Sequence, residues 1–189
     1  MTTASAPAKS ARRKARELAL QGLFEWLLSG TDAGAIEAFL HERYPTIKLD
    51  RALFESLLHG CIREAAMLDE LLQPLLDRPS RELSPVEHAL LLLGAYEMRF
   101  LPEVPYKVII NEAVDLAKVY GGTDGFKYVN GVLDRLAPEL RGDETAQRAP
   151  RAPTVRAPRA QSPAQAHAAV PVRIKEPREG ASPRRDRRG

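Results

Sequence analysis

Apolar residues recur every three or four positions along most of the chain before residue 141, which is the spacing of one face of an α-helix. The pattern predicts helices over 11–29, 33–43, 51–72, 84–100 and 106–120, and a last one from 123 or 124 to 137. The apolar face of the first helix consists of Ala15, Leu18, Ala19, Gly22, Leu23, Trp26 and Leu27. No part of 17–141 shows the alternation of a strand. The sequence therefore predicts an all-α bundle of about six to seven helices.

Residues at the expected helix ends support these limits. Ser84-Pro85-Val86-Glu87 combines an S-x-x-E capping box with proline at the first helical position. Asp50 stands where an N-cap is expected for the third helix, and Gly30 and Gly121 follow the ends of two others. Because glycine weakens the middle of a helix, we expect Gly131 to mark a close approach to a neighbouring helix.

Composition changes sharply after the last predicted helix. All eleven aromatic residues lie at or before Tyr128, whereas 142–189 holds seven prolines, ten alanines and eleven basic residues. Such a segment buries too little apolar surface to offset the entropy of ordering it. The sequence therefore predicts three parts: a flexible basic arm over 1–10, a helical domain over 11–141, and a disordered Pro/Ala/Arg-rich tail over 142–189.

Charge is segregated along the chain, although the formal total is only +3. Residues 1–16 contain five basic side chains and no acidic one, whereas 17–141 contains twelve basic and twenty acidic ones. A body of net negative charge repels phosphates except where basic residues are concentrated. The cationic start of the first helix is therefore a candidate nucleic-acid interface, and a solvated basic terminus is the competing interpretation.

Other functional classes find little support. The single cysteine, Cys61, excludes an internal disulfide, and its position on an apolar face indicates a packed thiol. The four histidines have no metal-ligand spacing, and no phosphate-binding glycine loop is present. We expect a cytoplasmic, non-enzymatic protein with no cofactor. We also expect no membrane segment, since the most apolar run, Ala89 to Ala95, is too short to span a bilayer.

Three stretches carry a family resemblance. They are Ala11-Arg12-Arg13-Lys14-Ala15-Arg16-Glu17, Val104-Pro105-Tyr106-Lys107-Val108-Ile109-Ile110-Asn111-Glu112-Ala113-Val114-Asp115-Leu116-Ala117-Lys118, and Phe126-Lys127-Tyr128-Val129-Asn130-Gly131-Val132-Leu133-Asp134. In these motifs the chain resembles the NusB family of bacterial transcription antitermination factors over about 11–141.

Some ribosomal RNA cytosine methyltransferases also begin with a NusB-like domain. They need a second α/β domain, for which the residues after Arg141 have neither strands nor a glycine-rich turn.

The resemblance implies a fold of two packed three-helix bundles. It also implies binding to boxA RNA in nascent transcripts of ribosomal RNA operons, together with NusE, a ribosomal small-subunit protein, in the antitermination complex of RNA polymerase. The alternative is a helical protein-interaction module or homodimer with only nonspecific RNA affinity. The basic tail departs from the family, whose members usually end soon after the last helix.

The expected RNA-binding residues are Arg12, Arg13, Lys14, Arg16, Phe24, Asp124, Lys127 and Tyr128. The arginines and lysines supply phosphate contacts, and Tyr128 supplies a ring for base stacking. Phe24 either stacks on a base or belongs to the core. Asp124 either caps the last helix or accepts a hydrogen bond from a base.

Glu87 is the residue that the resemblance assigns to NusE. Its position also fits a local role, because the glutamate of a capping box has a partner in the backbone N–H of Ser84. The negative charge of 17–141 suits a basic, RNA-binding protein partner.

Overall fold

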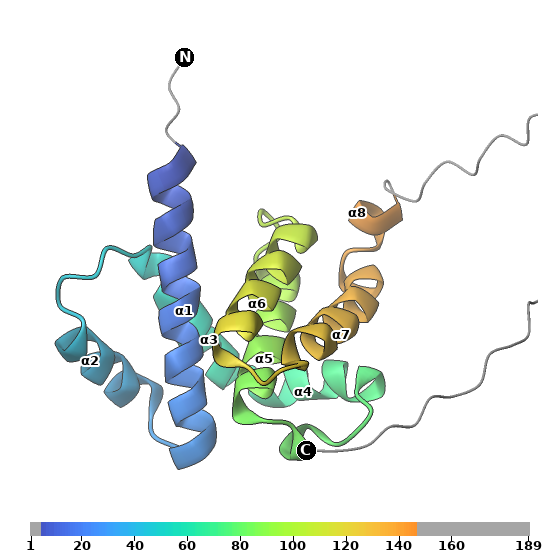
Figure 1. Ribbon diagram of the computed structural model, residues 1–189, viewed down its shortest axis with the longest axis horizontal. Helices are drawn as coiled ribbons and strands as arrows, with labels where there is room; N and C mark the ends of the chain where they lie inside the picture. The colour runs from blue at the N-terminus through green and yellow to red at the C-terminus, as the bar shows by residue number, and fades with distance from the viewer. Residues whose placement is uncertain (1–4, 147–189) are drawn as a thin grey trace, which may run out of the picture. The chain divides into compact units, whose positions relative to one another are not determined.

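The computed structural model describes residues 5–146, and helices make up most of them (Figure 1). The helices are α1 (Ser5–Ser29), α2 (Ala33–Arg43), α3 (Arg51–Arg63), α4 (Ala65–Leu72), α5 (Pro85–Phe100), α6 (Tyr106–Tyr120), α7 (Gly125–Leu140) and α8 (Gly142–Ala146). Two 3-10 turns, η1 (Gln73–Leu75) and η2 (Ser80–Glu82), lie between α4 and α5. The described residues contain no strand, and the all-α prediction is confirmed.

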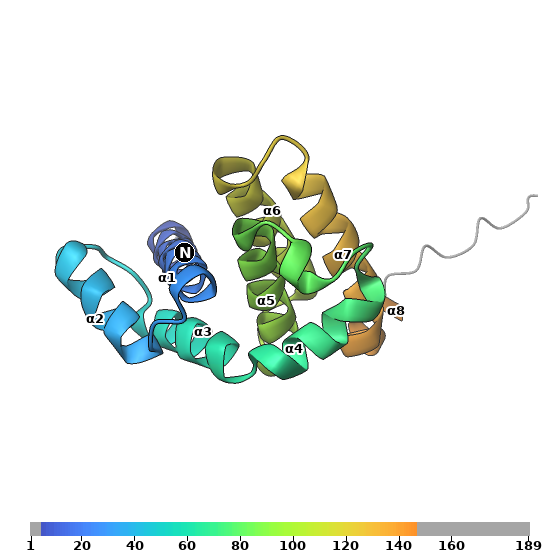
Figure 2. The same ribbon diagram turned by 90° about the horizontal axis from the view of Figure 1, so that it is seen from below.

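The helices form two groups of three. Helices α1, α2 and α3 pack together on one side, and α5, α6 and α7 pack together on the other. Figure 2 shows α4 following α3 and leading across to the second group. Helix α5 also contacts α1 and α3, so it belongs to the core of both groups. Every residue from Ala89 to Met98 is buried, as expected for a helix with neighbours on several sides.

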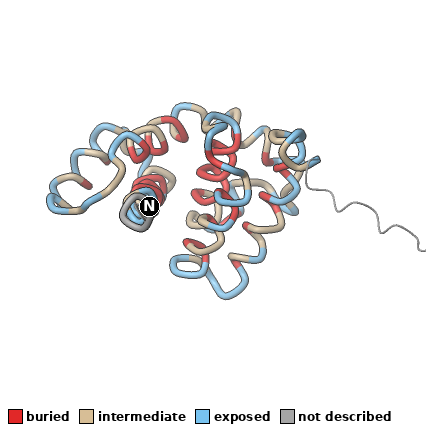
Figure 3. The backbone as a smooth tube through the Cα atoms, turned by 90° about the horizontal axis from the view of Figure 1, so that it is seen from above, coloured by how far each residue is buried: buried red, intermediate tan, exposed pale blue. Residues whose placement is uncertain are grey.

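The buried hydrophobic residues form one core cluster. Figure 3 marks the positions of buried residues in red along the backbone. On α1 they include Ala15, Leu18, Ala19 and Leu23, as the apolar pattern predicted, while Trp26 and Leu27 are half-buried at its edge. Helix ends also follow the sequence signals. The Oδ1 of Asp50 accepts from Leu53 N at 3.1 Å, and the hydroxyl of Ser84 accepts from Glu87 N at 3.3 Å.

Two predicted helix limits are wrong. Helix α1 begins at Ser5, so six of the ten residues of the arm predicted over 1–10 are helical. The single helix predicted over 51–72 is broken at Glu64, whose φ of −96° and ψ of 8° lie outside the helical region. The break changes the chain's direction because α3 packs on α1, whereas α4 packs on α5 and α7. Tertiary packing therefore overrides a continuous helical period.

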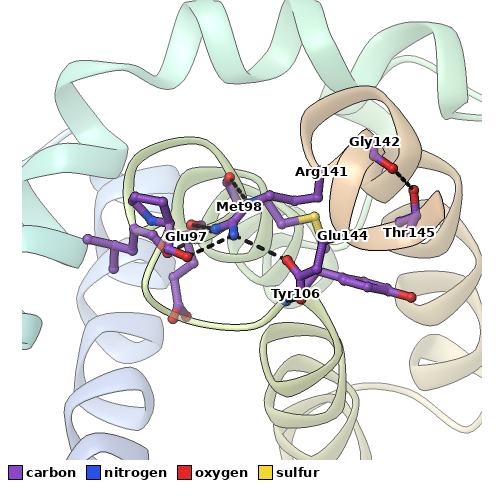
Figure 4. Close-up of polar contacts among 9 residues, drawn as sticks. Glu97, Met98, Tyr106, Arg141, Gly142, Glu144 and Thr145 are labelled. Carbon is purple, nitrogen blue, oxygen red and sulfur yellow. Dashed lines mark hydrogen bonds and ion pairs between the residues drawn. The ribbon is translucent and has the colours of Figure 1, made fainter. Parts of the chain in front are cut away.

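The boundary predicted at residue 142 is also wrong, because the chain continues into α8 (Figure 4). Arg141 donates to carbonyl oxygens at the end of α5, including those of Met98 at 2.7 Å and Leu101 at 2.9 Å. Glu144 of α8 accepts from Tyr106 N at 3.1 Å, which caps the start of α6. These contacts satisfy the free ends of two helices. The rest of the predicted tail, 147–189, lies outside the described residues.

Glycines mark close helix contacts, but not where the sequence predicted one. A Cβ at Gly94 of α5 would lie 2.7 Å from Leu133 Cδ1 of α7, and one at Gly60 of α3 would lie 2.2 Å from the Tyr96 ring. A Cβ at Gly131 would meet nothing nearer than Arg135 Nη1, at 3.7 Å. The expectation of close packing at Gly131 is therefore wrong, and this glycine only weakens its helix.

Candidate nucleic-acid interface

The basic cluster at the head of α1 divides between the interior and the surface. Arg12, Arg13 and Lys14 keep side-chain exposures of 48%, 43% and 45%, whereas the side chain of Arg16 is only 5% exposed. Arg16 lies on the face of α1 that packs against α5, as Ala15 and Ala19 do. The prediction that Arg16 presents an exposed cation is wrong, because its position along the helix does not show which face of α1 the core covers.

Arg16 forms a buried ion pair with Glu97 of α5. Its Nε donates to Glu97 Oε1 at 2.8 Å and its Nη2 donates to Glu97 Oε2 at 2.6 Å, so the contact is bidentate. Burial opposes the charge of Arg16, but the Glu97 carboxylate keeps the pKa of the guanidinium above its ordinary value. The backbone oxygen of Glu97 also accepts from Arg141 at 3.2 Å. The pair therefore fixes α1 against α5 and holds Arg12 and Arg13 in place.

The exposed cations of α1 each lie beside a carboxylate. Arg12 Nε is 3.5 Å from Asp50 Oδ2, and Lys14 Nζ donates to Glu17 Oε2 at 2.6 Å. Exposed pairs of this kind contribute little stability, typically about 0–1 kcal/mol. Their carboxylates are therefore readily exchanged for other anions such as phosphates.

A connected row of side chains crosses from α1 over α6 to α7, and we call it the basic–aromatic band. Arg13 Nη1 is 3.5 Å from Asp115 Oδ2, and Lys118 Nζ is 3.4 Å from Asp115 Oδ1. The ring of Phe126 lies next, with Lys118 Nζ and Lys127 Nζ each 5.8 Å from its centre. The band thus consists of Arg13, Asp115, Lys118, Phe126 and Lys127. The Phe126 ring is half-buried against the core, and two cations lie near it. Rings and cations placed together in this way can bind stacked bases and phosphates.

Sequence reasoning named Arg13 and Lys127 but missed the three residues that connect them. Lys118 ends one of the family motifs and Phe126 begins the next, and the α6–α7 turn at Gly121 and Gly122 lies between them. Such a turn brings the end of one helix beside the start of the next. That proximity was the available signal for Lys118 and Phe126.

A shallow depression of about 600 Å³ lies beyond Lys127, where α5 and α7 both begin. It is lined by Glu87, Asp124, Lys127 and Tyr128, which the sequence named, and by Arg78 of the loop before α5. Arg78 lies over the Tyr128 ring at 5.5 Å, and the Tyr128 hydroxyl donates to Asp77 Oδ1 at 3.0 Å. Hydrogen bonds from Arg78 and Tyr128 lower the pKa of Asp77 to about 2. Four of the nine predicted residues therefore meet at one place.

The two acidic residues of the depression do not cap their helices with their side chains. Asp124 precedes α7 but makes no capping hydrogen bond, and its Oδ1 lies 2.7 Å from Lys127 Nζ instead. The alternative in which the Asp124 side chain caps the last helix is therefore wrong. Ser84 N donates no hydrogen bond to the Glu87 carboxylate, and the capping box is closed only by Glu87 N donating to the Ser84 hydroxyl. The Glu87 carboxylate lies against Gly125, where a Cβ would be 2.9 Å from Oε1. This places its charge at the favourable N-terminus of α7.

Phe24 is exposed rather than part of the core, with 36% of its surface accessible. Phe24 follows Arg13 by eleven positions, which is about three helical turns. It therefore lies on the same face of α1 but about 16 Å further along the axis. Between them, Glu17 accepts a hydrogen bond from the hydroxyl of Tyr120. This bond raises the pKa of Tyr120 to about 12. The structure therefore brings Phe24 onto the face of α1 that carries Arg13, but not into the band.

The described part of the chain contains neither a metal-binding cluster nor an exposed thiol. Between residues 5 and 146, no three histidine, cysteine or acidic side chains gather to hold a metal ion. Cys61 is fully buried, and burial raises the pKa of its thiol well above the ordinary value, which disfavours the reactive thiolate. None of the helices of this part combines the length and apolar character needed to cross a membrane.

The fold and its charged, aromatic surface are those of a helical RNA-binding domain. The sequence matches the model of the NusB family over residues 13–138, and the chain belongs to this family. The transcription antitermination protein NusB of Ralstonia nicotianae is 61% identical over 143 residues, which are 76% of this chain and 92% of that protein. The NusB protein of Bordetella pertussis is 56% identical over 152 residues, 78% of this chain and 98% of that protein. The chain is therefore a transcription antitermination factor and not an enzyme.

Solved structures agree with the family. A crystal structure of the antitermination factors NusB and NusE in complex with double-stranded RNA matches with a TM-score of 0.63 and 28% identity, covering 69% of this chain and 98% of that one. NusB of T. maritima matches with a TM-score of 0.62 and 30% identity, covering 71% of this chain and 96% of that one. The predicted NusB-like fold is confirmed.

Proposed function

We propose that the protein binds the boxA segment of nascent ribosomal RNA transcripts jointly with NusE and so joins the antitermination complex of RNA polymerase. The basic–aromatic band carries the RNA part of this proposal. It connects the exposed cations Arg13, Lys118 and Lys127, and two of these cations lie 5.8 Å from the centre of the half-buried Phe126 ring. Single-stranded RNA is held by this combination of phosphate-tracking cations and stacking rings.

The carboxylates beside the cations set the conditions of binding. Arg12, Arg13, Lys14 and Lys127 each lie within 4 Å of an acidic side chain. An RNA strand has to replace these weak pairs, so a sequence that offers only phosphates gains little, and base contacts add the specificity. In this proposal Asp124 accepts from a base amino group once RNA has replaced its pair with Lys127. Tyr128 stacks at the far end of the RNA, and Arg16 holds α1 in position.

The depression beside Glu87 is the part of the surface assigned to NusE. Glu87 lines the depression together with Lys127 of the band, and its carboxylate accepts no hydrogen bond from Ser84 N that would occupy it. A basic partner docking there meets a body of net negative charge. The homologous complex of NusB with NusE and RNA supports a shared surface of this kind.

Fluorescence anisotropy tests the proposal with the full chain, using boxA RNA, a scrambled RNA of the same composition, and a boxA duplex, each with and without NusE. We expect selective binding of boxA that NusE tightens, and RNA should tighten NusE binding by the same factor because the coupling is reciprocal. The measurement with the boxA duplex decides whether this surface prefers single-stranded or double-stranded RNA.

Equal and weak binding of boxA and scrambled RNA, with no effect of NusE, contradicts the proposal. It would favour a helical interaction module or homodimer whose charge attracts polyanions without selection. RNA and NusE affinities that each stay unchanged when the other partner is added would contradict the shared surface.

A further inference from the structure

A groove of about 400 Å³ runs along the other side of Arg12, between the first half of α1 and the start of α6. Its apolar wall comes from Val104, Pro105 and Val108. Its polar lining comes from Arg12, Arg16, Asn111 and Glu112. Its volume falls within the range of small-molecule sites. Val108 is 42% exposed, so an apolar surface faces the open part of the groove.

Glu112 and Arg16 line the groove, and each keeps hydrogen-bonding capacity that the described residues do not use. Glu112 Oε2 is buried and has no hydrogen-bond partner among the described residues. A buried carboxylate oxygen is costly unless it receives hydrogen bonds. Arg16 lines the same groove, and only two of the five N–H donors of a guanidinium are used by its bonds to Glu97.

The mouth of the groove continues into the RNA surface. Arg12 lines the groove and is 48% exposed, and the next residue, Arg13, begins the basic–aromatic band. A strand whose phosphates follow the exposed cations therefore passes the opening of the groove. The groove is flanked by an apolar wall on one side, as suits the face of a base.

Guanine is the base whose edge matches this polar lining. Its N1–H and N2–H₂ groups are adjacent donors for one carboxylate, and its O6 is an acceptor for a neighbouring guanidinium. We propose that the groove binds a guanine base of single-stranded RNA, with Glu112 accepting from N1 and N2 and Arg16 donating to O6. This proposal rests on the proposed function, since it assumes that RNA lies along Arg12 and Arg13.

A titration with mononucleotides tests the groove directly. The ¹⁵N-labelled full chain is titrated with 5′-GMP, 5′-IMP and 5′-UMP, and backbone amide shifts are followed. IMP lacks the 2-amino group, so GMP should bind roughly tenfold more tightly than IMP because one charge-assisted hydrogen bond is lost. The GMP-induced shifts should centre on Val104, Val108 and Glu112.

Variants and RNA complete the test. Glu112→Gln should abolish the preference for GMP over IMP. The control is Glu103→Gln, which changes an exposed carboxylate directly before Val104 and should leave the preference unchanged. The map of shifts in the unmodified protein decides the matter if Glu112→Gln impairs folding. In a uridine oligomer with one central guanosine, replacing that guanosine by inosine should weaken binding by a similar factor.

Equal affinity for the three mononucleotides, or shifts confined to the surface around Phe126, would overturn the proposal. A preference for GMP without any effect of inosine in RNA would also overturn it, because the groove would then serve a free nucleotide. Selective boxA binding with no guanine preference removes only this inference. A guanine preference without boxA selectivity removes the proposed function but retains the groove.

Discussion

Arg13 and Arg16 lie three residues apart on α1, yet their environments are opposite. Arg13 is 43% exposed beside Asp115 at 3.5 Å, whereas Arg16 is 5% exposed in a bidentate contact with Glu97 at 2.6 and 2.8 Å. The first pair is weak and can exchange its carboxylate for a phosphate. The second cannot be opened without leaving a charge in the core. In this basic cluster, burial decides which cation is exposed to phosphates and which one holds the helix.

Removing the buried partner should have the largest effect. Glu97→Ala leaves the Arg16 guanidinium buried without a counter-charge, which should lower the free energy of unfolding by about 3–5 kcal/mol. Urea denaturation measures this change. The matched double variant Arg16→Met/Glu97→Met removes both charges and should recover most of the loss. A double variant as unstable as Glu97→Ala would contradict the idea that the unpaired charge causes the damage.

The stacking ring on the surface comes next. Phe126→Ala should weaken RNA binding by roughly tenfold to a hundredfold, since stacking contributes about 1–3 kcal/mol per base. Val119→Ala is the control, because it truncates a 64% exposed side chain beside Lys118 without touching the ring. Anisotropy with boxA RNA measures both, and circular dichroism checks that they fold. Equal losses in the two variants would remove Phe126 from the interface.

Two glycines extend the same contrast to helices α5 and α7. Gly94→Ala should destabilise the protein by about 1–3 kcal/mol, because its Cβ would lie 2.7 Å from Leu133 Cδ1 inside the core. Gly131→Ala should stabilise it by about 0.5–1 kcal/mol, because no atom opposes the methyl group within 3.7 Å. Thermal unfolding compares the two. Effects of the same sign would show that local space does not decide them.

The smallest expected effect concerns the carboxylate within the band. Asp115 pairs with both Arg13 and Lys118, so Asp115→Asn should release two cations and tighten RNA binding on the order of threefold. Asp134→Asn removes one negative charge from an exposed position on α7 and controls for net charge. If Asp134→Asn tightens binding equally, the effect is one of overall charge and not of the band.

The sequence predicted most of the fold because helical period and end signals are local. The Ser84 and Asp50 caps and the apolar face of α1 appear where the pattern placed them. The break at Glu64 and the attachment of α8 by Arg141 and Glu144 depend on contacts between distant segments, so no local pattern announced them.

The same limit applies to the interface. The sequence located cations at both ends of the band, Arg13 and Lys127, through motif similarity. It missed Asp115, Lys118 and Phe126, which join them through space. It also assigned Arg16 to the surface, since a helical wheel gives direction around the axis but not what lies there. Burial by α5 was needed to separate the anchoring arginine from the exposed ones.

The salt dependence of RNA binding tests the division between surface and buried cations most directly. Dissociation constants for boxA RNA are measured over a series of salt concentrations for the unmodified protein, Arg13→Ala/Lys127→Ala and Arg16→Met/Glu97→Met. We predict that the slope of log K against log salt falls by about 1.4 in the first variant, at about 0.7 per phosphate contact, and stays unchanged in the second. A slope that falls in the buried variant, or stays constant in the surface variant, would contradict the account.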